Sequence, residues 1–188
     1  YEPEGYTLYT YGAIQAWAAY CADHGPLAAA LHIDTGMSRL GLPQDELARL
    51  AEEPERLAGI DLRYTISHLA CAEERENPMN AGQLAELESA LGRLPPARVS
   101  FANSSGIFLG PGYHFDLGRP GVALYGANPT PGRESPMMHV VTLQSPIVQV
   151  REIDPPRTVG YGAAHRAEGH AIIATIPVGY ADGYLRSA

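Results

Sequence analysis

Residues 28–36 read Ala-Ala-Ala-Leu-His-Ile-Asp-Thr-Gly, a short and mostly apolar run that ends in polar residues and a glycine. Pro43 follows at a position where a helix can begin, and Leu47 and Leu50 continue at helical spacing. This order predicts a buried strand, then a loop, then a helix that packs against the strand.

The same order recurs along the first two thirds of the chain. Further strands are predicted at 61–66, 98–102 and 122–125, with amphipathic helices around Trp17 and Leu87. Strands that alternate with helices favour an α/β fold with a parallel sheet. Polar residues follow each strand, as they do on the active face of a (β/α)8 barrel. A doubly wound sheet obeys a similar rule, but the glycine pattern of a dinucleotide site is missing. We therefore predict about half of a (β/α)8 TIM barrel.

The stretch 129–136 contains three prolines and marks a change in the sequence pattern. Apolar runs follow without helices between them, and they predict strands at 140–143, 147–150 and 171–178. We assign 1–136 to the C-terminal portion of the barrel and 137–188 to the truncated beginning of a β-rich C-terminal domain. Because the sequence starts without Met and stops just after a strand-turn pattern, we expect a piece of a longer protein.

Composition narrows the classes of function. The net charge of -8 argues against nucleic-acid binding, and two cysteines provide neither a disulfide framework nor a zinc site. The lack of a disulfide framework indicates a reduced, cytoplasmic setting. No signal peptide or 18-residue apolar run is found, so we expect no membrane span. All 13 basic residues counted as Lys or Arg are arginines. Without a lysine amine, no side chain of this sequence can form a Schiff base with a carbonyl cofactor.

Taken singly, the polar motifs have ordinary structural explanations. Asp34-Thr35-Gly36 and Arg119-Pro120-Gly121 could be turns, and Arg39 could be a surface arginine. His68 could be a core histidine that bonds to a backbone carbonyl, and Ser104 could cap a short helix at 107–109.

Taken together and in order, six motifs resemble the alanine racemase family, whose members use pyridoxal 5'-phosphate (PLP). They are HIDTGMSRLG (32–41), SHLA (67–70), ANSS (102–105), RPGVALYG (119–126), VGYG (159–162) and IPVGYADGYLR (176–186). The resemblance implies an N-terminal (β/α)8 barrel, a C-terminal β domain, and interconversion of L-alanine and D-alanine for peptidoglycan. It also implies a homodimer whose active sites mix residues of both subunits. Two alternatives stay open: a racemase of this fold with broader amino-acid substrates, and a non-catalytic half-barrel module.

The resemblance implies a phosphate site for PLP around Ser104. The family serine at this position binds the phosphate, helped by backbone N–H groups that match Gly121 and Val122, and Asn103 belongs to the same motif. A hydroxyl and exposed amides at a helix start suit an anion.

The resemblance also assigns the groups around the PLP ring. Arg119 matches the arginine that faces the pyridine nitrogen, which stays unprotonated because arginine only donates hydrogen bonds. The ring is then a weaker electron sink, which favours racemisation over transamination. His68 matches a histidine that bonds this arginine, and Arg39 matches the arginine that lies near the phenolic oxygen of the ring and the substrate carboxylate.

Tyr180 matches one of the two catalytic bases of the family, and the resemblance implies that it serves the active site of the partner subunit. A phenol is a poor base at neutral pH unless a neighbour lowers its pKa, and His165 is a candidate for that neighbour. The second base is the PLP lysine, which is expected in sequence before Tyr1, so the chain alone is expected to be inactive. His32 stands where many members carry a carbamylated lysine, but it could still orient Arg39 by a hydrogen bond.

Overall fold

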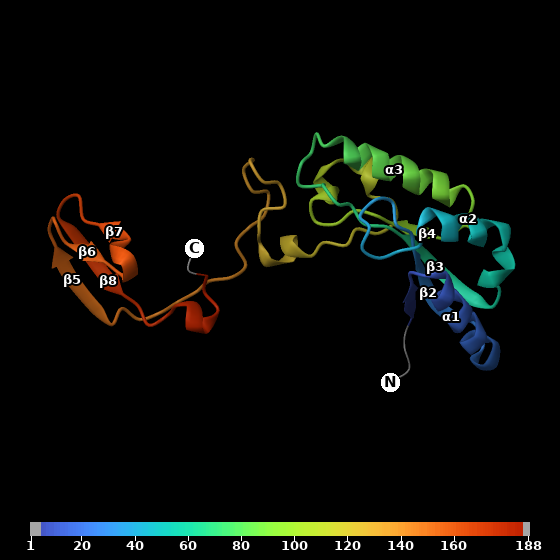
Figure 1. Ribbon diagram of the computed structural model, residues 1–188, viewed down its shortest axis with the longest axis horizontal. Coiled ribbons are helices and arrows are strands. Elements are labelled where there is room, and N and C mark those ends of the chain that lie inside the picture. The colour runs from blue at the N-terminus through green and yellow to red at the C-terminus, as the bar shows by residue number, and fades with distance from the viewer. Residues whose placement is uncertain (1–4, 186–188) are drawn as a thin grey trace. The chain divides into compact units, whose positions relative to one another are not determined.

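The computed structural model describes residues 5–185, and Arg186 of the sixth motif lies outside the described residues. The chain forms two compact units, one that extends to Val140 and one that begins at Val141 (Figure 1). Each unit is described by itself. Among the described residues, no helix combines the length and the apolar character that crossing a membrane requires.

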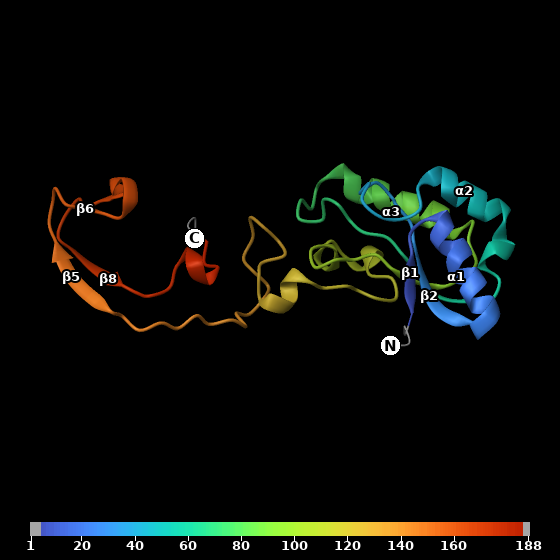
Figure 2. The ribbon, with the colours of Figure 1, turned by 60° about the horizontal axis from the view of Figure 1, so that its bottom comes forward.

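The first unit is built on a four-stranded sheet with the order β1-β2-β3-β4, and every neighbouring pair of strands is parallel. The strands are β1 (Tyr6–Leu8), β2 (Leu27–His32), β3 (Ile60–Ile66) and β4 (Arg98–Ser100). The connecting helices are α1 (Tyr11–His24), α2 (Gln44–Glu52) and α3 (Pro78–Leu91), which lie together on one side of the strands (Figure 2). Sequential parallel strands joined by helices are the repeating unit of a barrel wall, which agrees with the predicted half barrel.

The core of this unit forms where the helices meet the sheet. Leu31 of β2, Ile14 of α1 and Leu47 of α2 are all fully buried in one cluster. Helix α1 begins where the Thr10 side chain accepts a hydrogen bond from the Ala13 N–H at 3.1 Å. The burial of apolar side chains from successive βα units therefore holds the helices on the sheet.

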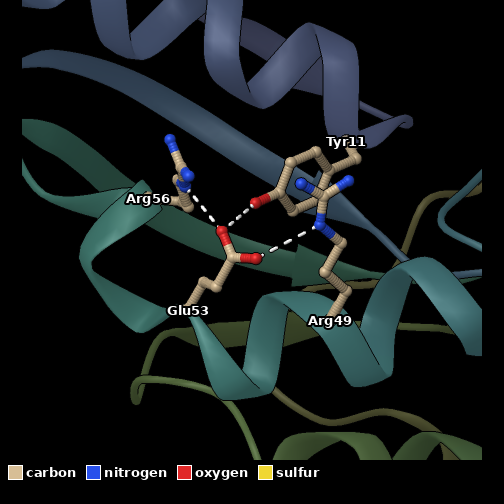
Figure 3. A network of polar contacts seen from close by, with 4 residues as sticks. All are labelled: Tyr11, Arg49, Glu53 and Arg56. Carbon is tan, nitrogen blue, oxygen red and sulfur yellow. Dashed lines mark hydrogen bonds and ion pairs between the residues drawn. The ribbon is translucent and has the colours of Figure 1, made fainter.

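A polar network ties the first turn of α1 to the end of α2 (Figure 3). The Tyr11 hydroxyl donates to Glu53 Oε2 at 2.5 Å, while Arg49 and Arg56 donate to Glu53 through their Nε atoms at 3.2 and 2.8 Å. The guanidinium of Arg49 also lies 4.0 Å from the centre of the Tyr11 ring. The hydrogen bond from Tyr11, followed by those from the two arginines, lowers the pKa of Glu53 from 4.5 to about 2.

Two sequence predictions near the third and fourth motifs are wrong: the strand at 122–125 and the helix cap at Ser104. Residues Val122–Tyr125 form a 3-10 helix, η4, rather than a strand. The N–H groups of Gly121 and Ala123 donate to the Ser104 Oγ instead of to a sheet ladder, and Gly126 ends the helix with a φ of +75°. The remaining strand of the sheet is instead β1, whose three residues are too few to show a periodic pattern.

Ser104 does not cap the short helix that follows it. Helix η2 (Gly106–Phe108) begins where Asn103 Oδ1 accepts a hydrogen bond from the Gly106 N–H at 2.8 Å. The Ser104 hydroxyl is already the acceptor for two N–H groups near η4, so it is not available to this helix.

The second unit contains two antiparallel pairs, β5 with β8 and β6 with β7. The strands are β5 (Gln149–Ile153), β6 (Thr158–Val159), β7 (His165–Arg166) and β8 (Ala171–Thr175). The predicted strands at 147–150 and 171–178 are thus present with shifted ends, but 140–143 is not a strand. Val141 and Leu143 in that run are exposed and pair with no strand among the described residues. The other 3-10 helices are η1 (Pro54–Leu57), η3 (Pro111–Tyr113), η5 (Tyr161–Ala163) and η6 (Tyr180–Asp182).

Candidate functional site

The predicted site residues of the first unit follow the carboxyl ends of its strands. Asp34 comes after β2, His68 after β3, and Asn103 after β4. Because the strands are parallel, these ends meet at one edge of the sheet, which is the active face of a barrel. Arg119 reaches the same edge, since its backbone N–H donates to the carbonyl of Ala102 at 2.8 Å.

Arg119 is half-buried, and its guanidinium is held by three groups. Nη1 donates to the Ser100 hydroxyl, and Nη2 donates to the backbone carbonyl of Ser67. Nη2 also lies 3.3 Å from Nδ1 of His68, so the predicted contact between this histidine and Arg119 is present. Burial lowers the pKa of Arg119, but a guanidinium remains protonated at neutral pH. The site therefore contains a fixed cation that faces the end of β3.

Two histidines, His68 and His32, lie near the Arg119 guanidinium. Burial, followed by the charge of Arg119, lowers the pKa of His68 from its ordinary 6.5. The same two causes, in the same order, lower the pKa of His32, and the neighbouring His68 adds to them. Both imidazoles are therefore neutral at pH 7, and each has a ring nitrogen that can accept a hydrogen bond.

The loop of the first motif is shaped by Asp34. Its Oδ1 accepts hydrogen bonds from the N–H groups of Gly36 and Ser38, at 2.9 and 3.0 Å. Arg39 in this loop is exposed, and its charge is close enough to contribute to the lowered pKa values of both histidines. None of the hydrogen bonds formed within residues 5–185 joins His32 to Arg39, because the Arg39 side chain extends toward solvent.

Ser104 is buried, at 5% exposure, beside the backbone that follows Arg119. Its Oγ accepts from the N–H of Gly121 at 2.8 Å and from the N–H of Ala123 at 3.2 Å. Ser104 and the Gly121 backbone thus lie together, while the joint binding of a phosphate by Ser104, Gly121 and Val122 stays a prediction. The Ala123 N–H was not predicted, because the family resemblance points only to the backbone at Gly121 and Val122.

Asn103 connects two loops of the site. Besides the bond to Gly106, its Nδ2 donates to the carbonyl of Leu69 at 3.2 Å. Gln83 of α3 is a second bridging residue, which sequence reasoning missed. Its signal in the sequence was a glutamine beside Leu84 and Leu87, on a helix whose apolar face is buried.

Tyr180 belongs to the second unit, where it begins η6. Its side chain is 70% exposed, and the turn around it is closed by a hydrogen bond from the Gly179 N–H to Asp182 Oδ2 at 3.0 Å. His165, its predicted neighbour, is an exposed residue of β7. The pairing of His165 with Tyr180 stays a prediction.

Comparison with known proteins identifies relatives of both units. The family model for the N-terminal domain of alanine racemase matches residues 5–129, and the model for its C-terminal domain matches 140–188. The alanine racemase of Rhodospirillum rubrum is 54% identical over 176 residues, which cover 93% of this chain and 47% of the relative. The alanine racemase of Brucella abortus is 45% identical in an alignment 188 positions long, which covers 93% of this chain and 48% of the relative.

Solved structures of the same family also match the chain. The alanine racemase of Bartonella henselae with covalently bound pyridoxal phosphate aligns at a TM-score of 0.84 and 39% identity, over 96% of this chain and 51% of that one. The biosynthetic alanine racemase of Pseudomonas aeruginosa aligns at 0.83 and 33% identity, over 97% and 51%. These matches confirm the predicted fold class, a partial barrel followed by the start of a β domain. The chain spans about half the length of the relatives that it matches.

Proposed function

The chain belongs to the alanine racemase family, and on that premise we propose that it provides part of a PLP-dependent site for interconverting L-alanine and D-alanine. The observation that carries the proposal is the guanidinium of Arg119, which is fixed by Ser67, Ser100 and His68 at the carboxyl edge of the parallel sheet. A cation that can only donate would face the pyridine nitrogen and keep it unprotonated.

The groups around Ser104 fit the phosphate of PLP. The hydroxyl already gathers the N–H groups of Gly121 and Ala123 at the start of η4, and the N–H of Val122 lies between them in sequence. Backbone N–H groups and a hydroxyl are suitable donors for a phosphate. We propose that Ser104, Gly121 and Val122 hold the phosphate, with Asn103 bracing the loop.

PLP supplies an electron sink that acidifies the α-hydrogen of a bound amino acid. It requires a lysine amine, and this chain contains none. We propose that the lysine comes from sequence outside these 188 residues and that the chain alone is inactive. Arg39, at the rim of the site, would then neutralise the substrate carboxylate.

Tyr180 is proposed to hold and deliver the proton on one face of the substrate. Its exposure suits a base that serves the active site of a second subunit in a homodimer. We further propose a domain boundary at 136–137, a cytoplasmic location, and supply of D-alanine for peptidoglycan. The alternative is a racemase of the same fold that accepts a broader range of amino acids than alanine.

The test is a chimera in which this chain replaces the matching 176-residue region of the R. rubrum alanine racemase. The chimera should racemise alanine and show the visible absorbance of lysine-bound PLP, whereas the 188-residue chain mixed with PLP should show neither. Tyr180→Phe in the chimera should slow α-proton exchange of one alanine enantiomer only. A chimera that binds PLP without racemising any amino acid would overturn the proposal, and racemisation of other amino acids would select the alternative.

A further inference from the structure

The side-chain amide of Gln83 is buried in the first unit and joins the loops that follow two different strands. Gln83 lies on α3 with 2% of its surface exposed. Its Oε1 accepts from the Ala70 N–H at 2.8 Å, and its Nε2 donates to the His68 carbonyl at 2.9 Å. The same Nε2 donates to Thr35 Oγ1 at 3.3 Å. A buried polar group is costly unless it is satisfied, and this amide has partners on both of its ends.

The segment that Gln83 holds is irregular. The Ser67 N–H still donates to the carbonyl of Ser100 in β4 at 3.2 Å, but residues 68–70 pair with no strand among the described residues. Their N–H and carbonyl groups therefore need other partners. Gln83 takes the carbonyl before Leu69 and the N–H after it, as a neighbouring strand would. One side chain therefore fixes the backbone of His68 relative to α3.

This segment supplies two of the three groups that hold Arg119, namely the carbonyl of Ser67 and Nδ1 of His68. The Ser67 hydroxyl lies 2.7 Å from Thr35 Oγ1, so the loop after β2 is tied to the same segment. The contacts form a continuous path from Gln83, through His68, to the guanidinium of Arg119.

We propose that Gln83 is a positioning residue, which fixes the imidazole of His68 against the Arg119 guanidinium. The importance of Gln83 for catalysis rests on the proposed function, whereas its positioning of the His68 imidazole does not. Since Arg119 only donates, His68 must present Nδ1 as an acceptor and carry its proton on Nε2. A small displacement of the 67–70 backbone would remove that constraint on the imidazole.

The test is an NMR titration of the His68 imidazole in the 188-residue chain, assigned with His68→Gln. Arg119 and Arg39 face this imidazole as cations, Glu73 as an anion, and His32 as a second imidazole. In Gln83→Met, which fills the same volume, the His68 midpoint should rise toward 6.5 because the imidazole moves away from Arg119. Gln15→Met, an exposed glutamine of α1, is the matched control and should leave the midpoint unchanged. If Ala70 N–H exchange accelerates in Gln83→Met while the His68 midpoint stays at the wild-type value, Gln83 is only structural and the proposal fails.

A second variant keeps the test decisive if Gln83→Met does not fold. Gln83→Glu retains an acceptor for the Ala70 N–H but loses the donor to the His68 carbonyl. The nitrogen-15 shifts of His68 should then show a smaller fraction of the Nε2–H tautomer than in the wild-type chain, and an unchanged fraction would overturn the proposal. Neither readout needs PLP or turnover, so failure here is separate from failure of the racemase proposal.

Discussion

Nη2 of Arg119 lies 3.3 Å from Nδ1 of His68, and this pair sets the protonation of the candidate site. Arginine has no acceptor, so the contact requires a neutral imidazole with its proton on Nε2. Protonation of His68 would place two cations against each other in a half-buried position, and the pKa of His68 is lowered accordingly by burial and by Arg119.

The first prediction concerns stability at mildly acidic pH. The folded pKa of His68 lies below 6.5, so the unfolded chain binds the proton more readily, and stability falls as pH decreases from 6.5 through the folded value. His68→Gln, which can still accept from Arg119, should reduce this dependence in urea titrations at pH values above and below 6.5. The exposed His139→Gln is the control, and an equal reduction in both variants would contradict the assignment.

The second prediction concerns Ser104. Ser104→Ala removes the acceptor for two N–H groups and should destabilise the chain by about 1–3 kcal/mol. Hydrogen exchange at Gly121 and Ala123 should accelerate, since these are the N–H groups that lose their partner. Ser105→Ala, at a neighbouring and similarly buried serine, should leave exchange at both positions unchanged. Unchanged exchange in Ser104→Ala would disprove the bonding pattern.

The third prediction concerns acid stability and the network in Figure 3. The pKa of Glu53 is lowered from 4.5 to about 2, so its contribution is present above 4.5 and is lost as pH falls through about 2. Glu53→Gln should flatten the pH dependence of unfolding in that window. The exposed Glu52→Gln is the control. Tyr11→Phe should raise the Glu53 pKa, because it removes the largest cause of the shift, and NMR titration of the Glu53 carboxyl would measure this.

The fourth prediction compares two glycines. Gly41 has a φ of +113°, and a Cβ there would lie 2.5 Å from the Asp34 backbone nitrogen. Gly41→Ala should destabilise the chain by more than about 1 kcal/mol, since the backbone must shift. A Cβ at Gly82, inside α3, would meet nothing within 4 Å. Gly82→Ala should therefore stabilise the chain by about 0.5–1 kcal/mol in the same denaturant titration, and destabilisation there would contradict the packing described.

The sequence was sufficient for the elements with a clear period. Leu31 and Ile33 belong to a run long enough to predict β2, and Ile14 with Cys21 marks one face of α1. The sequence did not predict the conformation where hydrogen bonds between distant residues override the local conformational preference. Val122 and Tyr125 favour a strand, yet the N–H groups of Gly121 and Ala123 donate to the Ser104 hydroxyl and the backbone forms the 3-10 helix η4.

The amino-acid sequence by itself determined the family, through six motifs in order, and the absence of any lysine amine. It also placed His68 and Ser104 after the ends of predicted strands, which share one carboxyl edge in a parallel sheet. Arg119 was expected ahead of a strand at 122–125, and only the hydrogen bond from its N–H to the Ala102 carbonyl brings it to that edge. Only the tertiary structure decided that Asn103 rather than Ser104 caps η2 and that Gln83 holds the backbone of His68. The physical reason is that the Ser104 hydroxyl is engaged by the N–H of Gly121, 17 positions away, and Gln83 bonds His68, 15 positions away. Bonds between residues so far apart depend on how the loops and helices pack on the sheet, which no local pattern records.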